Sequence, residues 1–142
     1  MPDTNTRIST LKYRNRFFSE STVLVVDDNV QNLELLQAFL DELPVQVVTA
    51  CNGGDALEKV DEHRPDLILL DVMMPRMSGF QVCQRLKSDV ATKHIPILMI
   101  TVLNEPSEME RAHDAGVDEL VSKPVSRLDI VTRVKRLLRF ED

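Results

Sequence analysis

Short apolar runs alternate with amphipathic segments from Thr22 onward. The runs are 23–26, 45–50, 67–70, 97–100 and 120–121. Each run is short enough for a β-strand, and most are flanked by turn-forming or charged residues. The segments between them have helical periodicity. The pattern therefore predicts five strands alternating with five helices, which is typical of a doubly wound α/β protein with a parallel sheet covered on both faces.

The composition of the runs predicts where each strand lies in the sheet. The first, third and fourth runs are wholly apolar, as expected of strands that are buried on both faces. The second run contains Gln46 and Thr49, and the fifth is bounded by Glu119 and Ser122, so these two strands are expected at the edges. Few strand orders satisfy this arrangement, and the familiar one is 2-1-3-4-5.

Helix start signals support this division of the chain. A helix is expected after Asn29, where leucines recur every three or four residues as far as Leu43, and Pro44 then ends it. The final helix is expected from about Arg127 to Phe140. Capping-box spacing marks three further starts, at Ser78 with Gln81, at Ser107 with Glu110, and at Ser126 with Asp129.

The ordered pattern predicts one domain over residues 21–140. The chain has 142 residues, of which 43% are hydrophobic, and this is enough for one substantial core. Residues 1–20 show no apolar periodicity and are expected to form a polar N-terminal extension.

Charge and cysteine usage exclude several classes of protein. The formal net charge of −6 argues against a nucleic-acid-binding surface, which needs a basic footprint. No apolar run approaches the roughly 20 residues that span a bilayer. The two cysteines, Cys51 and Cys83, provide neither a disulfide framework nor a zinc-binding spacing. We therefore expect a cytoplasmic protein that binds neither nucleic acid nor membrane directly.

Polar residues follow the apolar runs. Asp27 and Asp28 follow the first run, Asp71 the third and Thr101 the fourth, and Lys123 comes shortly after the fifth. In a parallel sheet these positions share the carboxyl edge, where open α/β folds bind their ligands. Neighbouring strands are about 4.8 Å apart, so the five side chains are expected to meet in one pocket.

Each of these residues taken alone has an ordinary structural explanation. An aspartate after a strand is often a helix cap or turn residue, and a lone lysine is usually a solvated charge. Three carboxylates at adjacent strand ends, however, repel one another and raise at least one pKa unless a cation lies among them. Mg²⁺ suits such a site because it prefers a few carboxylates together with water and phosphate oxygens.

The residues that form this pocket carry a family resemblance. The segment Val26-Asp27-Asp28-Asn29, the segment Asp71-Val72-Met73-Met74-Pro75 with Gly79, the single Thr101 and the pair Lys123-Pro124 together resemble the receiver domains of response regulators. The resemblance covers about Thr22 to Arg139. Any one of these motifs is weak evidence, whereas the four together at this spacing are highly specific.

The resemblance implies a phosphoacceptor and a metal site. Asp71 matches the aspartate that accepts a phosphoryl group from a histidine kinase or a small phosphodonor. Asp27 and Asp28 match the acidic residues that bind Mg²⁺ together with that aspartate, and the backbone carbonyl at Met73 matches the remaining protein ligand.

The resemblance also assigns roles to the other pocket residues. Lys123 is expected to bind one phosphoryl oxygen, and Thr101 to move its hydroxyl onto another and carry the following loop with it. The peptide before Pro124 matches one that is cis in the family, which would aim Lys123 into the pocket.

Two positions depart from the family pattern, and both belong to the expected switch region with Thr101 and Pro124. Leu120 replaces an aromatic residue that usually swings inward when the threonine moves, so an aromatic rotamer switch is absent here. Val102 follows Thr101 where a small residue is typical, and it is expected to crowd access to the phosphoryl group.

The implied partners are a sensor histidine kinase or phosphotransfer protein, and an output domain or downstream protein. The family signals through the face formed by the last two helices and the last strand, so a homodimer through that face is a further candidate. The final helix is basic, which suits either a docking surface or a solvated helix C-terminus.

Three other functions compete with this interpretation. An aspartyl-phosphate phosphatase usually has a second acid two residues after its nucleophile, where this chain has Met73. A flavodoxin-like cofactor binder needs a Gly/Ser/Thr-rich phosphate loop after the first strand, where this chain has Asp27, Asp28 and Asn29. The third, a receiver-like interaction module that is never phosphorylated, stays open because of Val102 and Leu120. The sequence thus favours a signalling domain over an enzyme.

Overall fold

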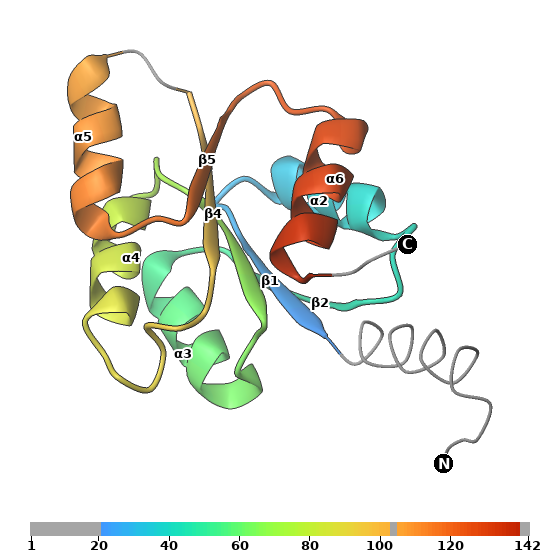
Figure 1. The fold of residues 1–142 in the computed structure, drawn as a ribbon, viewed down its shortest axis with the longest axis horizontal. Coiled ribbons are helices and arrows are strands. Elements are labelled where there is room, and N and C mark those ends of the chain that lie inside the picture. The colour runs from blue at the N-terminus through green and yellow to red at the C-terminus, as the bar shows by residue number, and fades with distance from the viewer. Residues whose placement is uncertain (1–20, 103–104, 140–142) are drawn as a thin grey trace.

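The structure is a computed structural model and describes residues 21–102 and 105–139. The expected extension at residues 1–20 lies outside these residues, and the last helix, expected to run to about Phe140, ends earlier at Leu137. No helix within the described ranges is both long and apolar enough to cross a membrane. The elements shown in Figure 1 are β1 (Thr22–Val26), α2 (Val30–Leu40), β2 (Gln46–Ala50), α3 (Gly53–His63), β3 (Leu67–Asp71), α4 (Gly79–Lys87), β4 (Ile97–Thr101), α5 (Pro106–Ala115), β5 (Glu119–Ser122) and α6 (Arg127–Leu137).

The five strands form one parallel sheet in the order β2-β1-β3-β4-β5, as the apolar content of the runs predicted. Every residue of β3 and β4 is buried, and β1 is buried apart from its first residue. The edge strands β2 and β5 are largely half-exposed. The predicted fold class and strand order are therefore confirmed.

Helices cover both faces of the sheet (Figure 1). Alternate residues along each central strand enter different cores, because successive strand side chains point to opposite faces. Leu24 and Ile68 pack in the core beneath α3, α4 and α5, whereas Val23 and Leu67 pack in the core beneath α2 and α6. The two cores hold the carboxyl ends of the strands at one rigid edge.

Side-chain caps fix most helix starts where the sequence predicted them. The Asn29 side chain accepts a hydrogen bond from the backbone N–H of Asn32 and begins α2. The predicted capping box of α4 is present, with Ser78 and Gln81 bonded to each other's backbone N–H. The predicted cap of α6 is also present at Ser126.

The predicted start of α5 at Ser107 with Glu110 is wrong. The cap is Glu105, which forms a capping box with Glu108, and Pro106 occupies the first turn. Proline suits that position because its φ angle is already helical and the N–H it lacks would have no partner inside the helix. The helix therefore begins before Ser107, and the spacing of Ser107 and Glu110 was a coincidence of composition.

The second helix is shorter than its leucine periodicity predicted. It ends at Leu40, and a turn follows in which the N–H of Leu43 donates to the carbonyl of Leu40 at 2.9 Å. Leu43 is nevertheless buried in the same core, so its side chain continues the apolar pattern after the helix has ended.

A charged cluster fastens the amino-terminal edge of the sheet. The Lys87 ammonium at the end of α4 contacts Asp118 at 2.8 Å and donates to the carbonyl oxygen of Ile95 at 2.7 Å. The same Asp118 carboxylate accepts from the N–H of Ile97 at 2.8 Å. The Lys87 side chain and the Asp118 carboxylate together thus join α4 to the N-terminal ends of β4 and β5.

Candidate functional site

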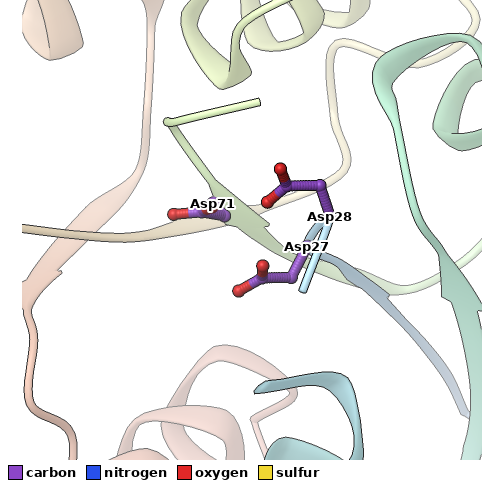
Figure 2. A group of neighbouring side chains, drawn as sticks. All are labelled: Asp27, Asp28 and Asp71. Carbon is purple, nitrogen blue, oxygen red and sulfur yellow. The ribbon is translucent and has the colours of Figure 1, made fainter. Parts of the chain in front are cut away.

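Three carboxylates meet at the carboxyl-terminal edge of the sheet (Figure 2). Asp27 and Asp28 follow β1, and Asp71 is the last residue of β3. One carboxylate oxygen from each lies within 4.8 Å of the others. Asp27 and Asp71 are buried, whereas Asp28 is exposed at the mouth of the group. The structure therefore brings together the three acidic residues that the sequence singled out.

The backbone holds Asp27 in place without using it as a helix cap. Its N–H donates to the carbonyl of Ala50 in β2 at 3.1 Å. Its Oδ1 accepts from the N–H of Asn29 at 2.9 Å, and it is Asn29 that caps α2. Asp27 is therefore not the helix cap, although its Oδ1 does make the local turn contact that is the other ordinary explanation. Its Oδ2 faces Lys123 of the site at 3.7 Å.

Lys123 supplies the positive charge of the site. Its Nζ lies 3.3 Å from Asp71 Oδ1 and 3.7 Å from Asp27 Oδ2. Its backbone N–H donates to the carbonyl of Thr101 at 2.9 Å, which ties the end of β5 to the end of β4. The Lys123–Pro124 peptide is cis, as the family resemblance implied.

The surroundings of Asp71 disfavour its charge. Burial raises the pKa of the Asp71 carboxyl above its ordinary value, and repulsion by Asp27 raises it further. The nearby Lys123 lowers the pKa but does not cancel these effects. A further cation at this group would relieve the repulsion between the carboxylates.

This shift predicts how stability depends on pH in protein freed of divalent cations. With a raised pKa in the folded state, Asp71 binds a proton more tightly than in the unfolded chain, so its contribution is most favourable at low pH and is lost as pH rises through the raised value. Asp71→Asn should therefore raise Tm at neutral pH by a few degrees. Thermal unfolding in chelator measures this, and the gain should vanish below the ordinary carboxyl pKa; a lower Tm at neutral pH would contradict it.

The donor set fits Mg²⁺. Three carboxylate oxygens within 4.8 Å of one another provide hard ligands on one side of a site for a single Mg²⁺ ion. Mg²⁺ accepts one or two carboxylates and keeps several waters, so a partly exposed Asp28 is compatible with such a site. The hard oxygen ligands and the absence of histidine and cysteine from the cluster favour Mg²⁺ over softer metals.

Thr101 presents a buried hydroxyl beside this group. The residue is 2% exposed, and its Oγ1 has no hydrogen-bond partner among the described residues. A buried hydroxyl without a partner costs about 1–3 kcal/mol, so an acceptor that reached Thr101 would remove this cost.

The turn after Asp71 depends on a close backbone approach at Gly79. The N–H of Gly79 donates to the carbonyl of Val72 at 2.9 Å and closes the turn. A Cβ at Gly79 would overlap the carbonyl oxygen of Asp71 and lie 2.9 Å from the Cα of Val72. The sequence identified Gly79 only as part of the motif that begins at Asp71. The need for a residue without a Cβ at this position is visible only in the fold.

The remaining predicted residues lie around this centre. The side chain of Met73 is 70% exposed in the turn after Asp71, and the use of its carbonyl as a ligand stays a prediction. Val102 is 48% exposed directly after β4. Leu120 pairs with Met99 in the sheet and packs, partly buried, against the core beneath α3, α4 and α5. The switching roles of Val102, Leu120 and Pro124 stay predictions.

A pocket of about 340 Å³ adjoins the acidic group, and the sequence analysis did not predict it. It contains Asp27 and Lys123 at the site and extends to apolar residues of α2, including Leu35. One feature of the sequence does indicate the pocket: Leu35 is apolar but lies outside the buried face of α2. That face consists of Leu33, Leu36 and Leu40.

Comparisons with known proteins agree with this geometry. Residues 23–135 match the family model described as "Response regulator receiver domain". The chain is similar to the response regulator PleD of Caulobacter vibrioides, with 41% identity over 84% of this chain and 26% of that protein. It is also similar to the alkaline phosphatase synthesis transcriptional regulatory protein PhoP of Bacillus subtilis, with 38% identity over 82% of this chain and 48% of that protein.

A solved structure has the same fold. It is the signal receiver domain of a signal transduction histidine kinase from Syntrophus aciditrophicus, with a TM-score of 0.81 and 33% identity over 84% of this chain and 91% of that one. The chain thus spans about a quarter of PleD and about half of PhoP, but nearly all of an isolated receiver domain. On the match of the family model to most of its length, this chain belongs to the response regulator receiver domain family.

Proposed function

We propose that Asp71 is the phosphoacceptor of this receiver domain. Phosphorylation of an aspartate and dependence on Mg²⁺ are general to the family. The observation that supports the assignment is the convergence of Asp27, Asp28 and Asp71 within 4.8 Å, with the Lys123 ammonium 3.3 Å from Asp71. No observation favours a receiver-like module that is never phosphorylated.

Asp27, Asp28 and Asp71 would hold the metal, with the Met73 carbonyl as a further ligand by analogy with the family. When bound, Mg²⁺ supplies charge neutralisation for the phosphoryl oxygens and for the carboxylates. An oxygen of Asp71 forms the bond to phosphorus, and the bond between phosphorus and the donor's leaving atom breaks, with the electron pair going to the leaving group. Lys123 binds one phosphoryl oxygen and orients the group during the transfer.

Thr101 links phosphorylation to a change in shape. Its buried hydroxyl has no hydrogen-bond partner in the part of the chain that the structure describes, and a phosphoryl oxygen on Asp71 would offer a strong acceptor. Phosphorylation adds about −1.5 to −2 charges at neutral pH. Movement of Thr101 toward the phosphoryl group would displace the chain that follows β4. The added charge at Asp71 would thereby change the surface that the domain presents to a partner.

The first test is phosphorylation by acetyl phosphate, measured as intact mass. With Mg²⁺ the protein should gain the mass of one phosphoryl group, and excess chelator should slow this gain by at least about 100-fold because the charge among the carboxylates is then uncompensated. Calcium in place of magnesium is a matched control, since it demands more ligands at longer distances. Equal rates with Mg²⁺ and with chelator would contradict the proposal.

Receiver domains interact with histidine kinases or phosphotransfer proteins and with output domains. We propose that the signalling face of this chain is formed by α5, β5 and α6, and that a homodimer could use the same face. On this face Glu119 of β5 binds Arg133 at 2.9 Å and Arg136 at 2.6 Å, and Arg133 also binds Asp129 at 2.9 Å. These pairs compensate much of the positive charge of α6, so a partner would meet a mixed surface there rather than a purely basic one.

A further inference from the structure

The pocket beside the acidic group has the composition of a small-molecule site. Its volume is about 340 Å³, within the usual range for ligand pockets, which are mainly apolar with a few polar groups at defined places. Its polar residues are Asp27, Asn32 and Lys123. Its apolar residues are Leu35 and Leu36 of α2, Ile100 and Val102 at the end of β4, and Pro124 and Val125 after β5.

Two lining residues connect the pocket to the phosphorylation site. Lys123 contacts both Asp71 and Asp27, and Asp27 itself lines the pocket. A small molecule whose phosphoryl group binds Lys123 therefore has the pocket directly beside it. The apolar lining is open to a ligand, because Leu35 is 47% exposed and Val102 is 48% exposed.

We propose that this pocket is an acyl-binding subsite that favours phosphodonors with an apolar chain, such as acyl phosphates of medium-length aliphatic acids. The inference rests on the proposed function of Asp71. An oxygen of Asp71 bonds to phosphorus, the bond from phosphorus to the acyl oxygen breaks, and the carboxylate leaves with the electron pair. No proton, oxidant or further reactant is needed.

The charges around the pocket favour this class of donor. The phosphoryl end of an acyl phosphate would bind the Lys123 ammonium, and its chain would contact the uncharged apolar side chains of the pocket. We expect a six-carbon chain to cover more of the apolar lining, including Leu35 and Val102, than an acetyl group does. Buried methylene groups contribute cumulatively to binding, so discrimination should grow with chain length until the pocket is full.

Binding can be measured without any phosphoryl transfer by using alkylphosphonates, whose carbon–phosphorus bond does not break. In the presence of Mg²⁺, hexylphosphonate should bind at least about tenfold more tightly than methylphosphonate, measured by NMR titration of amide signals. Leu35→Gln should remove most of this difference. The matched control is Leu128→Gln, because Leu128 is 76% exposed on α6 and does not line the pocket. Equal affinities for the two phosphonates would overturn the inference.

The kinetic test compares hexanoyl phosphate with acetyl phosphate, whose leaving carboxylates are of nearly the same basicity. The kcat/KM for phosphorylation should be about tenfold higher with hexanoyl phosphate, and Leu35→Gln should reduce that ratio while Leu128→Gln leaves it unchanged. Equal kcat/KM values for the two donors would overturn the subsite and leave the role of Asp71 intact. Failure of both donors to phosphorylate the protein would overturn the proposed function itself.

Discussion

Replacement of Asp71 with asparagine is expected to abolish phosphorylation by acetyl phosphate, with a fall in rate of at least about 10³-fold. The amide has nearly the shape of the carboxylate but lacks the anionic oxygen that would attack phosphorus. The substitution also removes one of the three carboxylates that lie within 4.8 Å of one another. Intact mass after incubation with acetyl phosphate and Mg²⁺ measures the result directly.

A matched control separates loss of the phosphoacceptor from loss of negative charge. Asp114 is an exposed carboxylate on α5, away from the acidic group, so Asp114→Asn should be phosphorylated at the wild-type rate. Circular dichroism should show that Asp71→Asn keeps the fold. A full phosphoryl mass gain in folded Asp71→Asn would show that another residue is the acceptor, and peptide mapping would then identify it.

Replacement of Gly79 with alanine is expected to lower the free energy of unfolding by about 3 kcal/mol. The added Cβ would overlap the carbonyl oxygen of Asp71 and crowd the Cα of Val72. Both obstacles are backbone atoms, so the end of β3 or the start of α4 must shift to relieve them. Because the displaced residue is Asp71, the phosphorylation rate should fall together with stability. Urea denaturation and the acetyl phosphate assay measure the two effects.

Gly54 supplies the control for this prediction. A Cβ at Gly54 meets only the side-chain oxygen of Asn52 at 3.5 Å, which is ordinary van der Waals contact. Gly54 is the second residue of α3, and alanine restricts the unfolded chain more than glycine does. Gly54→Ala should therefore match or exceed the wild type in stability. A Gly79→Ala protein as stable as Gly54→Ala would show that the turn can open without cost.

The arrangement of the strands could be predicted from sequence because burial leaves a direct record in composition. The runs that became β1, β3 and β4 have no polar residue, since side chains on both of their faces enter a core. The meeting of Asp27, Asp71 and Lys123 followed from the same logic, because parallel strands end at one edge. No knowledge of side-chain packing was needed for either prediction.

Features that depend on packing between distant segments could not be predicted in this way. The pocket forms where α2 meets the segment after β5, so Leu35 and Val125 line one cavity although they are far apart in the chain. The start of α5 was misjudged because its N-cap is Glu105, a residue type outside the usual Ser, Thr, Asp and Asn caps. The lack of a hydrogen-bond partner for the Thr101 hydroxyl, within residues 21–102 and 105–139, likewise depends on its surroundings in the fold.

The cluster around Lys87 has a consequence for how the domain moves. It links the N-terminal ends of β4 and β5 to α4. At the C-terminal ends of the same strands, Thr101 and Lys123 lie beside the acidic group. The contacts of Lys87 and Asp118 therefore restrain the N-terminal ends of β4 and β5, while the C-terminal ends remain free of this restraint. We therefore expect the displacement of β4 on phosphorylation to be smallest near Ile97 and to increase toward Thr101.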